Sequence, residues 1–219
     1  MNNVLNHSRW VLLALSSLLN LIFVVPYGYA IMRGSVRPNR VTWFLWLLLA
    51  VVSLLAVLKA GGRYEAVFNL CIVVGEGLIF GLALFKGETV FTRLDAVALG
   101  GGLLALASLL VLTDPLWTLL AVLVTDLFGF IPTWAKSWRD PASESLPTFL
   151  ITFSACLCGY LAVADGALIY FLYPLYLTLG NGVLVAILFW RRASQTGPEN
   201  TQFQVAEIPS GRDGQPRPH

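Results

Sequence analysis

The sequence predicts an all-α integral membrane protein with seven transmembrane helices, arranged as two parallel three-helix repeats joined by a linker helix (3+1+3). Three observations predict this fold: the composition, seven apolar stretches of membrane-spanning length, and a spacing pattern that occurs twice. Of the 219 residues, 57% are hydrophobic and 12% are charged, and the mean hydropathy is +0.75. A water-soluble domain of this composition would expose much apolar surface, so lipid surrounds most of the chain.

Seven apolar stretches approach the ~20 residues that a helix needs to cross a bilayer. Lipid cannot bond with backbone N–H and C=O groups, and the alternating pattern of a membrane β-barrel does not occur, so we expect helices. The expected spans are residues 10–32, 41–58, 66–85, 94–112, 115–135, 146–163 and 167–190.

The spans divide the chain into four parts. We expect a first repeat in residues 1–90, a linker helix in 91–113 and a second repeat in 114–193. Residues 194–219 are rich in Gly, Pro and Gln with few apolar side chains, so this segment cannot bury enough surface to fold. It is predicted to be a disordered cytoplasmic tail.

The basic residues predict the orientation. With seven spans the loops alternate sides, and 11 of the 14 Lys and Arg residues then share one side, which the positive-inside rule places in the cytoplasm. We therefore expect an outside N-terminus and a cytoplasmic C-terminus, in the plasma (inner) membrane. The eleven are Arg33, Arg37, Arg40, Lys86, Arg93, Lys136, Arg139, Arg191, Arg192, Arg212 and Arg217, and the other three are Arg9, Lys59 and Arg63.

One spacing occurs in both halves of the chain. A proline is followed sixteen positions later by a threonine and then an aromatic residue, at Pro26, Thr42 and Trp43 and again at Pro132, Thr148 and Phe149. At the same offset Asn20 corresponds to Asp126. One position off that register, Gly75-Glu76-Gly77 corresponds to Gly180-Asn181-Gly182. A chance match between apolar sequences is the alternative, but the ordered matches favour a repeat.

This arrangement resembles the PQ-loop and SWEET transporter superfamily. Its members carry a Pro-Gln pair late in the first helix of each unit, then a basic loop and a hydroxyl residue. Here the pairs are Pro26-Tyr27 and Pro132-Thr133, without the glutamine, and the hydroxyl residues are Thr42 and Thr148. The resemblance implies that the two units rock about a midplane site, with Pro26 and Pro132 as hinges. It also implies a substrate contact at Glu76 and Asn181, which match an asparagine of each third helix. A static kink is the alternative role for the prolines.

Polar side chains deep in the spans are the candidate substrate-binding residues. Such groups are costly in lipid unless they are partnered or functional. The candidates are the acids Glu76 and Asp126 and the amides Asn20, Asn69 and Asn181. Hydrogen bonds that only hold helices together are the alternative.

Two tryptophans complete the candidate site. Trp43 and Trp46 begin the second span, where a position in the interfacial aromatic belt is favoured for at least one of them and a cavity wall is the alternative.

The predicted function is a membrane carrier for a small polar solute such as a sugar, an amino acid or a vitamin-like molecule. A buried carboxyl can take up and release a proton, which makes proton coupling a candidate energy source. The alternative is a receptor or assembly factor on the same scaffold. No phosphate loop, nucleophile motif or zinc motif occurs in its required context, so we expect no enzyme activity, cofactor, metal or nucleic-acid partner. The expected partners are the solute and the bilayer. A homo-oligomer is a further possible assembly.

Overall fold

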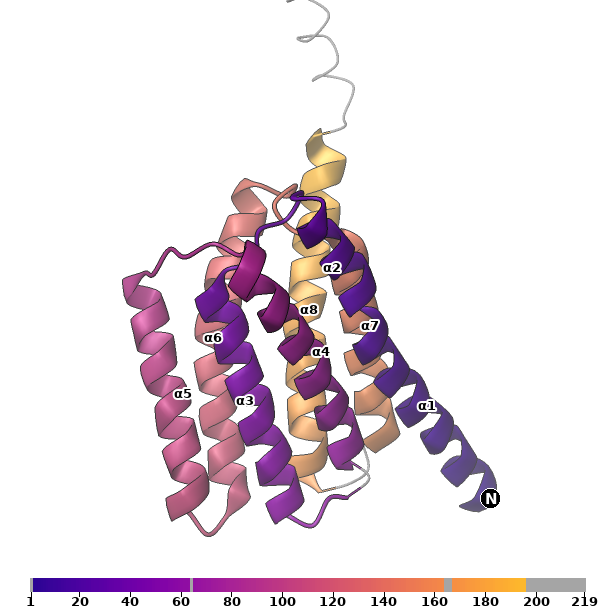
Figure 1. Ribbon diagram of the computed structural model, residues 1–219. Helices are drawn as coiled ribbons and strands as arrows, with labels where there is room; N and C mark the ends of the chain where they lie inside the picture. The colour runs from indigo at the N-terminus through magenta and orange to yellow at the C-terminus, as the bar shows by residue number, and fades with distance from the viewer. Residues whose placement is uncertain (1, 64, 164–166, 196–219) are drawn as a thin grey trace, which may run out of the picture.

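The protein folds into a bundle of helices, as the computed structural model shows (Figure 1). The structure describes residues 2–63, 65–163 and 167–195. The helices are α1 (Asn2–Ile22), α2 (Val24–Met32), α3 (Arg40–Lys59), α4 (Glu65–Lys86), α5 (Arg93–Val111), α6 (Pro115–Arg139), α7 (Leu146–Val163) and α8 (Leu168–Gln195). The predicted all-α fold is confirmed.

Six helical segments in the described residues are long and apolar enough to cross a membrane, with α1 and α2 together counting as one of them. The predicted linker span is α5, whose apolar part, Asp95–Val111, is shorter than the others. The last helix, α8, ends at Gln195, two residues beyond the predicted end of the second repeat. The rest of the predicted tail, residues 196–219, lies outside the described residues.

Side chains in the loops fix where helices begin. The carboxamide oxygen of Asn39 accepts hydrogen bonds from the backbone N–H groups of Val41 and Thr42 at the start of α3. Thr92 and Asp95 form a reciprocal capping box at α5, and Asp114 caps α6. These caps satisfy N–H groups that have no partner within their own helix.

Pro26 explains the break between α1 and α2. A proline has no N–H group, so the carbonyl of Ile22 loses the helical hydrogen bond that residue 26 would donate. The chain stays close to helical there, because Phe23 N–H donates to Leu19 and Tyr27 N–H to Phe23. By contrast, α6 runs unbroken through Pro132, whose side chain lies outside the described part. The hinge role of both prolines stays a prediction.

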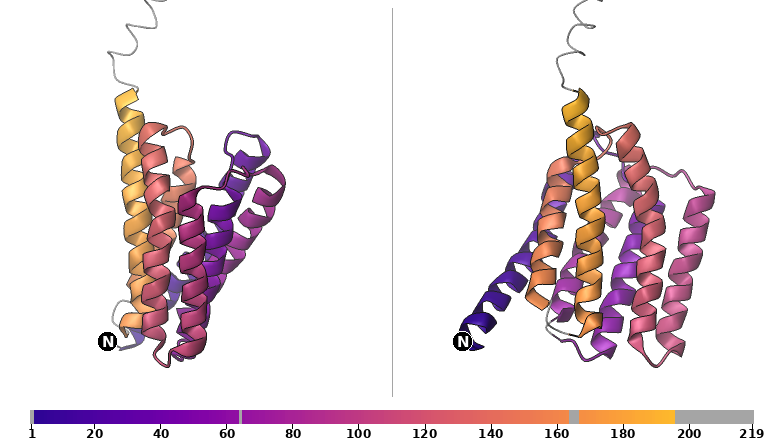
Figure 2. Two further views of the ribbon diagram at one scale, coloured as in Figure 1. Left: turned by 90° about the vertical axis from the view of Figure 1, so that its left-hand side faces the viewer. Right: turned by 180° about the vertical axis from the view of Figure 1, so that it is seen from behind.

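Six spans close into a ring. In the first half α4 packs between α1 and α3, and in the second half α8 packs between α6 and α7. The halves meet where α1 packs on α7 and α3 packs on α6, while α5 lies outside the ring against α3 and α6 (Figures 1 and 2). Exchanging α1 with α6, α3 with α7 and α4 with α8 reproduces the same packing pairs. This pattern supports the division into two units, which stays a prediction.

The paired helices also run in the same direction. In Figure 1, α1, α4, α6 and α8 ascend while α3, α5 and α7 descend. Loops 33–39, 87–92 and 140–145 therefore meet at the upper end of the bundle, together with the end of α8. This is the end that carries most of the basic residues, and it is named the basic end below.

Glycines let the first and third helix of each half approach closely. A Cβ atom at Gly75 would lie 2.6 Å from Cε1 of Phe23 and 2.7 Å from the backbone oxygen of Asn20. A Cβ atom at Gly180 would lie 2.8 Å from Cε2 of Phe130. The two glycines that the repeat alignment pairs therefore make similar contacts, Gly75 with Phe23 between α1 and α2 and Gly180 with Phe130 of α6.

Gly75→Ala is expected to destabilise the bundle, whereas Gly81→Ala is not. A methyl group at Gly75 meets a backbone oxygen that cannot move away, and overpacking of this kind costs about 1–3 kcal/mol. Gly81 lies on the same helix with nothing within 4 Å of an added Cβ atom, so it is the matched control. The thermal unfolding midpoint of each purified variant in detergent tests this, and equal midpoints would contradict the packing described.

Candidate functional site

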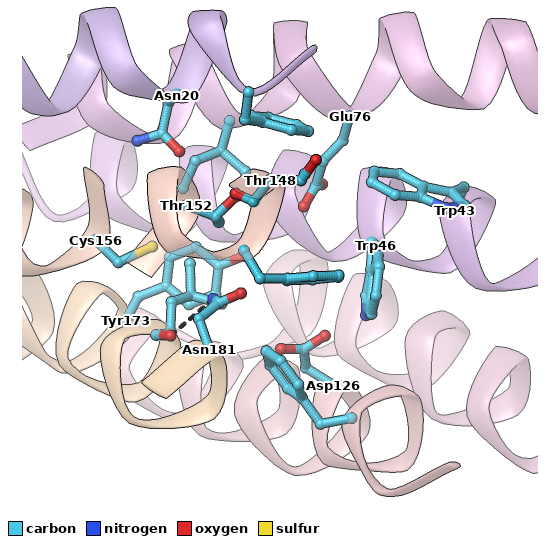
Figure 3. A pocket seen from close by; sticks show the side chains of 15 residues that line it. Asn20, Trp43, Trp46, Glu76, Asp126, Thr148, Thr152, Cys156, Tyr173 and Asn181 are labelled. Atoms are coloured by element: carbon cyan, nitrogen blue, oxygen red, sulfur yellow. Dashed lines mark hydrogen bonds between the residues drawn. The ribbon is translucent and has the colours of Figure 1, made fainter. Parts of the chain in front are cut away.

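A cavity lies in the centre of the ring, between the two three-helix units (Figure 3). It encloses about 630 Å³, including the space at its opening. Side chains from both units line it. Six of the seven predicted substrate-binding residues are among them: Asn20, Trp43, Trp46, Glu76, Asp126 and Asn181.

The two acids reach the cavity from opposite units, Glu76 from α4 and Asp126 from α6. Asp126 is only 2% exposed. Within the described structure, Oε2 of Glu76 and Oδ2 of Asp126 are buried without a hydrogen-bond partner. Nε1 of Trp46 is also buried without one, and in Figure 3 this nitrogen points toward Asp126. The cavity therefore holds polar atoms without a hydrogen bond of good geometry, although the Trp46 indole and the Tyr176 hydroxyl lie beside the Asp126 carboxyl.

The two amide side chains in the cavity each donate a hydrogen bond to a backbone carbonyl of their own helix. Nδ2 of Asn20 donates to the carbonyl oxygen of Ser16 at 3.1 Å, and Nδ2 of Asn181 donates to that of Leu177 at 2.8 Å. Each amide oxygen lies on the cavity side in Figure 3. Two hydroxyl groups behave alike: Thr152 donates to the Thr148 carbonyl, and Thr148 donates to Oγ of Ser145. The lining thus presents mainly acceptors.

Aromatic rings form the walls. Trp43 and Trp46 meet edge to face with centroids 5.1 Å apart, and Trp46 lies 6.1 Å from Phe130. Trp43 is only 5% exposed, so it faces the protein interior. Both tryptophans hold the cavity-wall position that was the alternative to the aromatic belt.

Sequence reasoning missed several apolar lining residues: Phe23, Ile72, Phe130, Phe149, Tyr173 and Leu177. Phe149 could have been predicted from the repeat, because it corresponds to Trp43, which was a candidate. The others carry no signal that separates them from the many apolar residues around them.

Asn69 and Pro26 do not line the cavity. The amide oxygen of Asn69 accepts a 3.0 Å hydrogen bond from Oγ of Ser53, and Nδ2 donates to the Glu65 carbonyl. Asn69 therefore joins α4 to α3. This is the helix-bridging hydrogen bond that was the alternative to substrate binding for the amides.

A second cavity of about 770 Å³ adjoins the first toward the basic end. The two cavities share Trp43, Trp46 and Phe149. The second one is lined by more polar residues, including Lys136 and Glu144, which form an ion pair with Nζ 3.3 Å from Oε1. Burial raises the pKa of Glu144, and the charge of Lys136 opposes this rise.

No protein-family model, curated protein or solved structure matches this chain. The resemblance to the PQ-loop and SWEET superfamily accordingly stays a prediction. What the site does is inferred below from its own geometry.

Lys136→Met is expected to destabilise the protein in a pH-dependent way. Glu144 is 8% exposed, and without Lys136 its carboxylate loses its counter-charge. The folded-state pKa then rises further above the ordinary Glu value of about 4.3, so the protonated form favours folding at low pH. That stabilisation is lost as the pH rises through the folded-state pKa. The loss should therefore be small near pH 4 and reach about 1–2 kcal/mol above neutrality, because Lys136 is half exposed.

Thermal unfolding of the purified variant between pH 4 and 8 measures this effect. The double variant Lys136→Met/Glu144→Gln should recover most of the lost stability at pH 8, because no buried charge remains. A loss that is equal at every pH, or that the second substitution does not reduce, would contradict the assigned ion pair.

Proposed function

We propose that the chain is a membrane carrier that moves a small polar solute through the central cavity by alternating access. The observation that supports it most directly is the cavity itself. It lies between two similarly packed units, and unsatisfied carboxyl oxygens face into an otherwise largely aromatic chamber. A purely structural bundle has no physical reason to keep such atoms unpartnered, because an unpaired buried polar group costs about 1–3 kcal/mol.

The two ends of the bundle differ in the way alternating access requires. The main apolar core draws residues from α1 and from α3 to α8, and members such as Leu119 and Ala162 lie away from the basic end. There the Tyr170 hydroxyl donates to the carbonyl of Ala60, which ties α8 to the end of α3. At the basic end the second cavity extends from the first. We therefore assign the structure to a state open toward the basic end, with Trp43, Trp46 and Phe149 as the gate between the cavities.

Glu76 and Asp126 are the proposed proton-coupling groups. Each unit contributes one acid, so a movement between the units changes the surroundings of both. Ionisable groups buried in membrane proteins commonly form proton pathways. The proposed location is the plasma (inner) membrane, with the basic end in the cytoplasm by the positive-inside rule.

Uptake into proteoliposomes tests the proposal. A panel of radiolabelled sugars, amino acids, amines and vitamins is offered with and without a proton gradient. We expect at least one solute to accumulate, and the gradient to increase its uptake. Glu76→Gln and Asp126→Asn should each lower uptake by about tenfold or more, the value of a charged hydrogen bond.

Glu65→Gln is the matched control, since Glu65 lies on the same helix as Glu76 but outside the cavity. It should transport like the wild type. If no solute accumulates, or if the cavity variants match the wild type under every gradient, the carrier proposal fails. A solute that binds but is never moved would instead favour a receptor.

A further inference from the structure

The chemistry of the cavity lining restricts the solute. Hydrogen-bond acceptors dominate it: the carboxyl groups of Glu76 and Asp126 and the amide oxygens of Asn20 and Asn181. The hydroxyl hydrogens of Thr148 and Thr152 already have acceptors within the protein. A solute that fits must therefore bring donors.

The charges of the lining have one sign. Both ionisable carboxyl groups are acidic, and the described residues that line the cavity include no lysine, arginine or histidine. Basic side chains line the adjoining cavity instead, where Lys136 is paired with Glu144. Asp126 is 2% exposed, and its Oδ2 makes no hydrogen bond of good geometry, although the Trp46 indole N–H and the Tyr176 hydroxyl lie beside the carboxyl group. These neighbours are neutral donors, so the described lining holds no charge that would balance an ionised Glu76 or Asp126.

The walls favour an organic cation over a metal ion. Trp43, Trp46 and Phe130 form a continuous aromatic surface, with neighbouring centroids 5.1 Å and 6.1 Å apart. Ring faces attract ammonium groups and also pack against apolar carbon. A hard metal ion prefers a cage of oxygen ligands rich in carboxylates, and the described residues contain no group of three His, Cys, Asp or Glu side chains that could hold one.

We propose that the solute is a small organic ammonium ion, that is, a protonated amine on an apolar or aromatic body without a carboxylate. Its transport rests on the proposed carrier function, whereas its binding does not. The ammonium group donates to Asp126 and Glu76, and its body lies against the tryptophans. An anion or an amino acid is disfavoured, because its carboxylate would face two acids with no base to receive it.

Matched ligands test separately the need for an ammonium group and the effect of an added carboxylate. Phenethylamine carries the ammonium group, 2-phenylethanol replaces it with a neutral hydroxyl group, and phenylalanine adds a carboxylate. Tyramine and tyrosine form a second pair. Binding to the purified full chain in lipid nanodiscs is measured by isothermal titration calorimetry. The dissociation constants of the amines should be lower than those of the alcohol and the amino acids by about tenfold or more.

Cavity variants locate the contacts. Asp126→Asn should weaken phenethylamine binding by about tenfold or more, and Asp126→Glu should retain most of it because the charge remains. Trp43→Leu should weaken binding by about fivefold. Trp117→Leu is the matched control: Trp117 is 62% exposed and lies outside the cavity, so its loss should leave binding unchanged. An unchanged unfolding midpoint shows that each variant is folded.

The outcomes distinguish this inference from the proposed function. No amine binding, equal binding of amine and alcohol, or full binding by Asp126→Asn would each overturn the ammonium site. Proteoliposomes that take up a sugar or amino acid while no amine binds would overturn it and leave the carrier standing. Amines that bind but do not accumulate in proteoliposomes would support the ammonium site and contradict the carrier.

Discussion

The close approach of the first and third helices within each half is the contact on which the site depends. It is made at Gly75, where an added Cβ atom would meet Phe23 and the backbone oxygen of Asn20, and at Gly180, where it would meet the ring of Phe130. Glu76 and Asn181 follow these glycines directly, so the same contact sets their positions. Both side chains line the cavity, Glu76 from α4 and Asn181 from α8. A packing constraint in each half therefore positions one polar group for the site.

Much of the fold was predictable because lipid offers no hydrogen-bond partners to the backbone. Backbone groups must bond within the chain, so apolar stretches such as 146–163 become helices, and α7 begins and ends at those residues. Four residues that line the cavity, Asn20, Glu76, Asp126 and Asn181, were predictable for a related reason. A polar side chain such as Asp126 stands out against an apolar span, and its cost in lipid indicates either a partner or a function.

Other features depend on neighbours that one sequence does not reveal. Asn69 has the same kind of signal as Asn181, but Ser53 on α3 lies close enough to bond with it, and only the packing of α3 on α4 shows this. Aromatic wall residues such as Phe130 are invisible for the opposite reason. In an apolar span, a ring that faces a cavity and a ring that faces lipid satisfy the same rule, so hydropathy cannot separate them.

The asymmetry between the halves has a mechanical consequence. At positions that the predicted sequence repeat pairs, one half carries an acid and the other an amide: Glu76 with Asn181, and Asp126 with Asn20. Because the pairs are reversed, each half contributes one acid, and in the proposed carrier a rocking of one half against the other would change the separation of the acids. Two unneutralised carboxylates would repel each other strongly in the buried cavity. In the proposed carrier, a bound cation or proton would remove that repulsion, and occupancy of the cavity would then shift the balance between the open states.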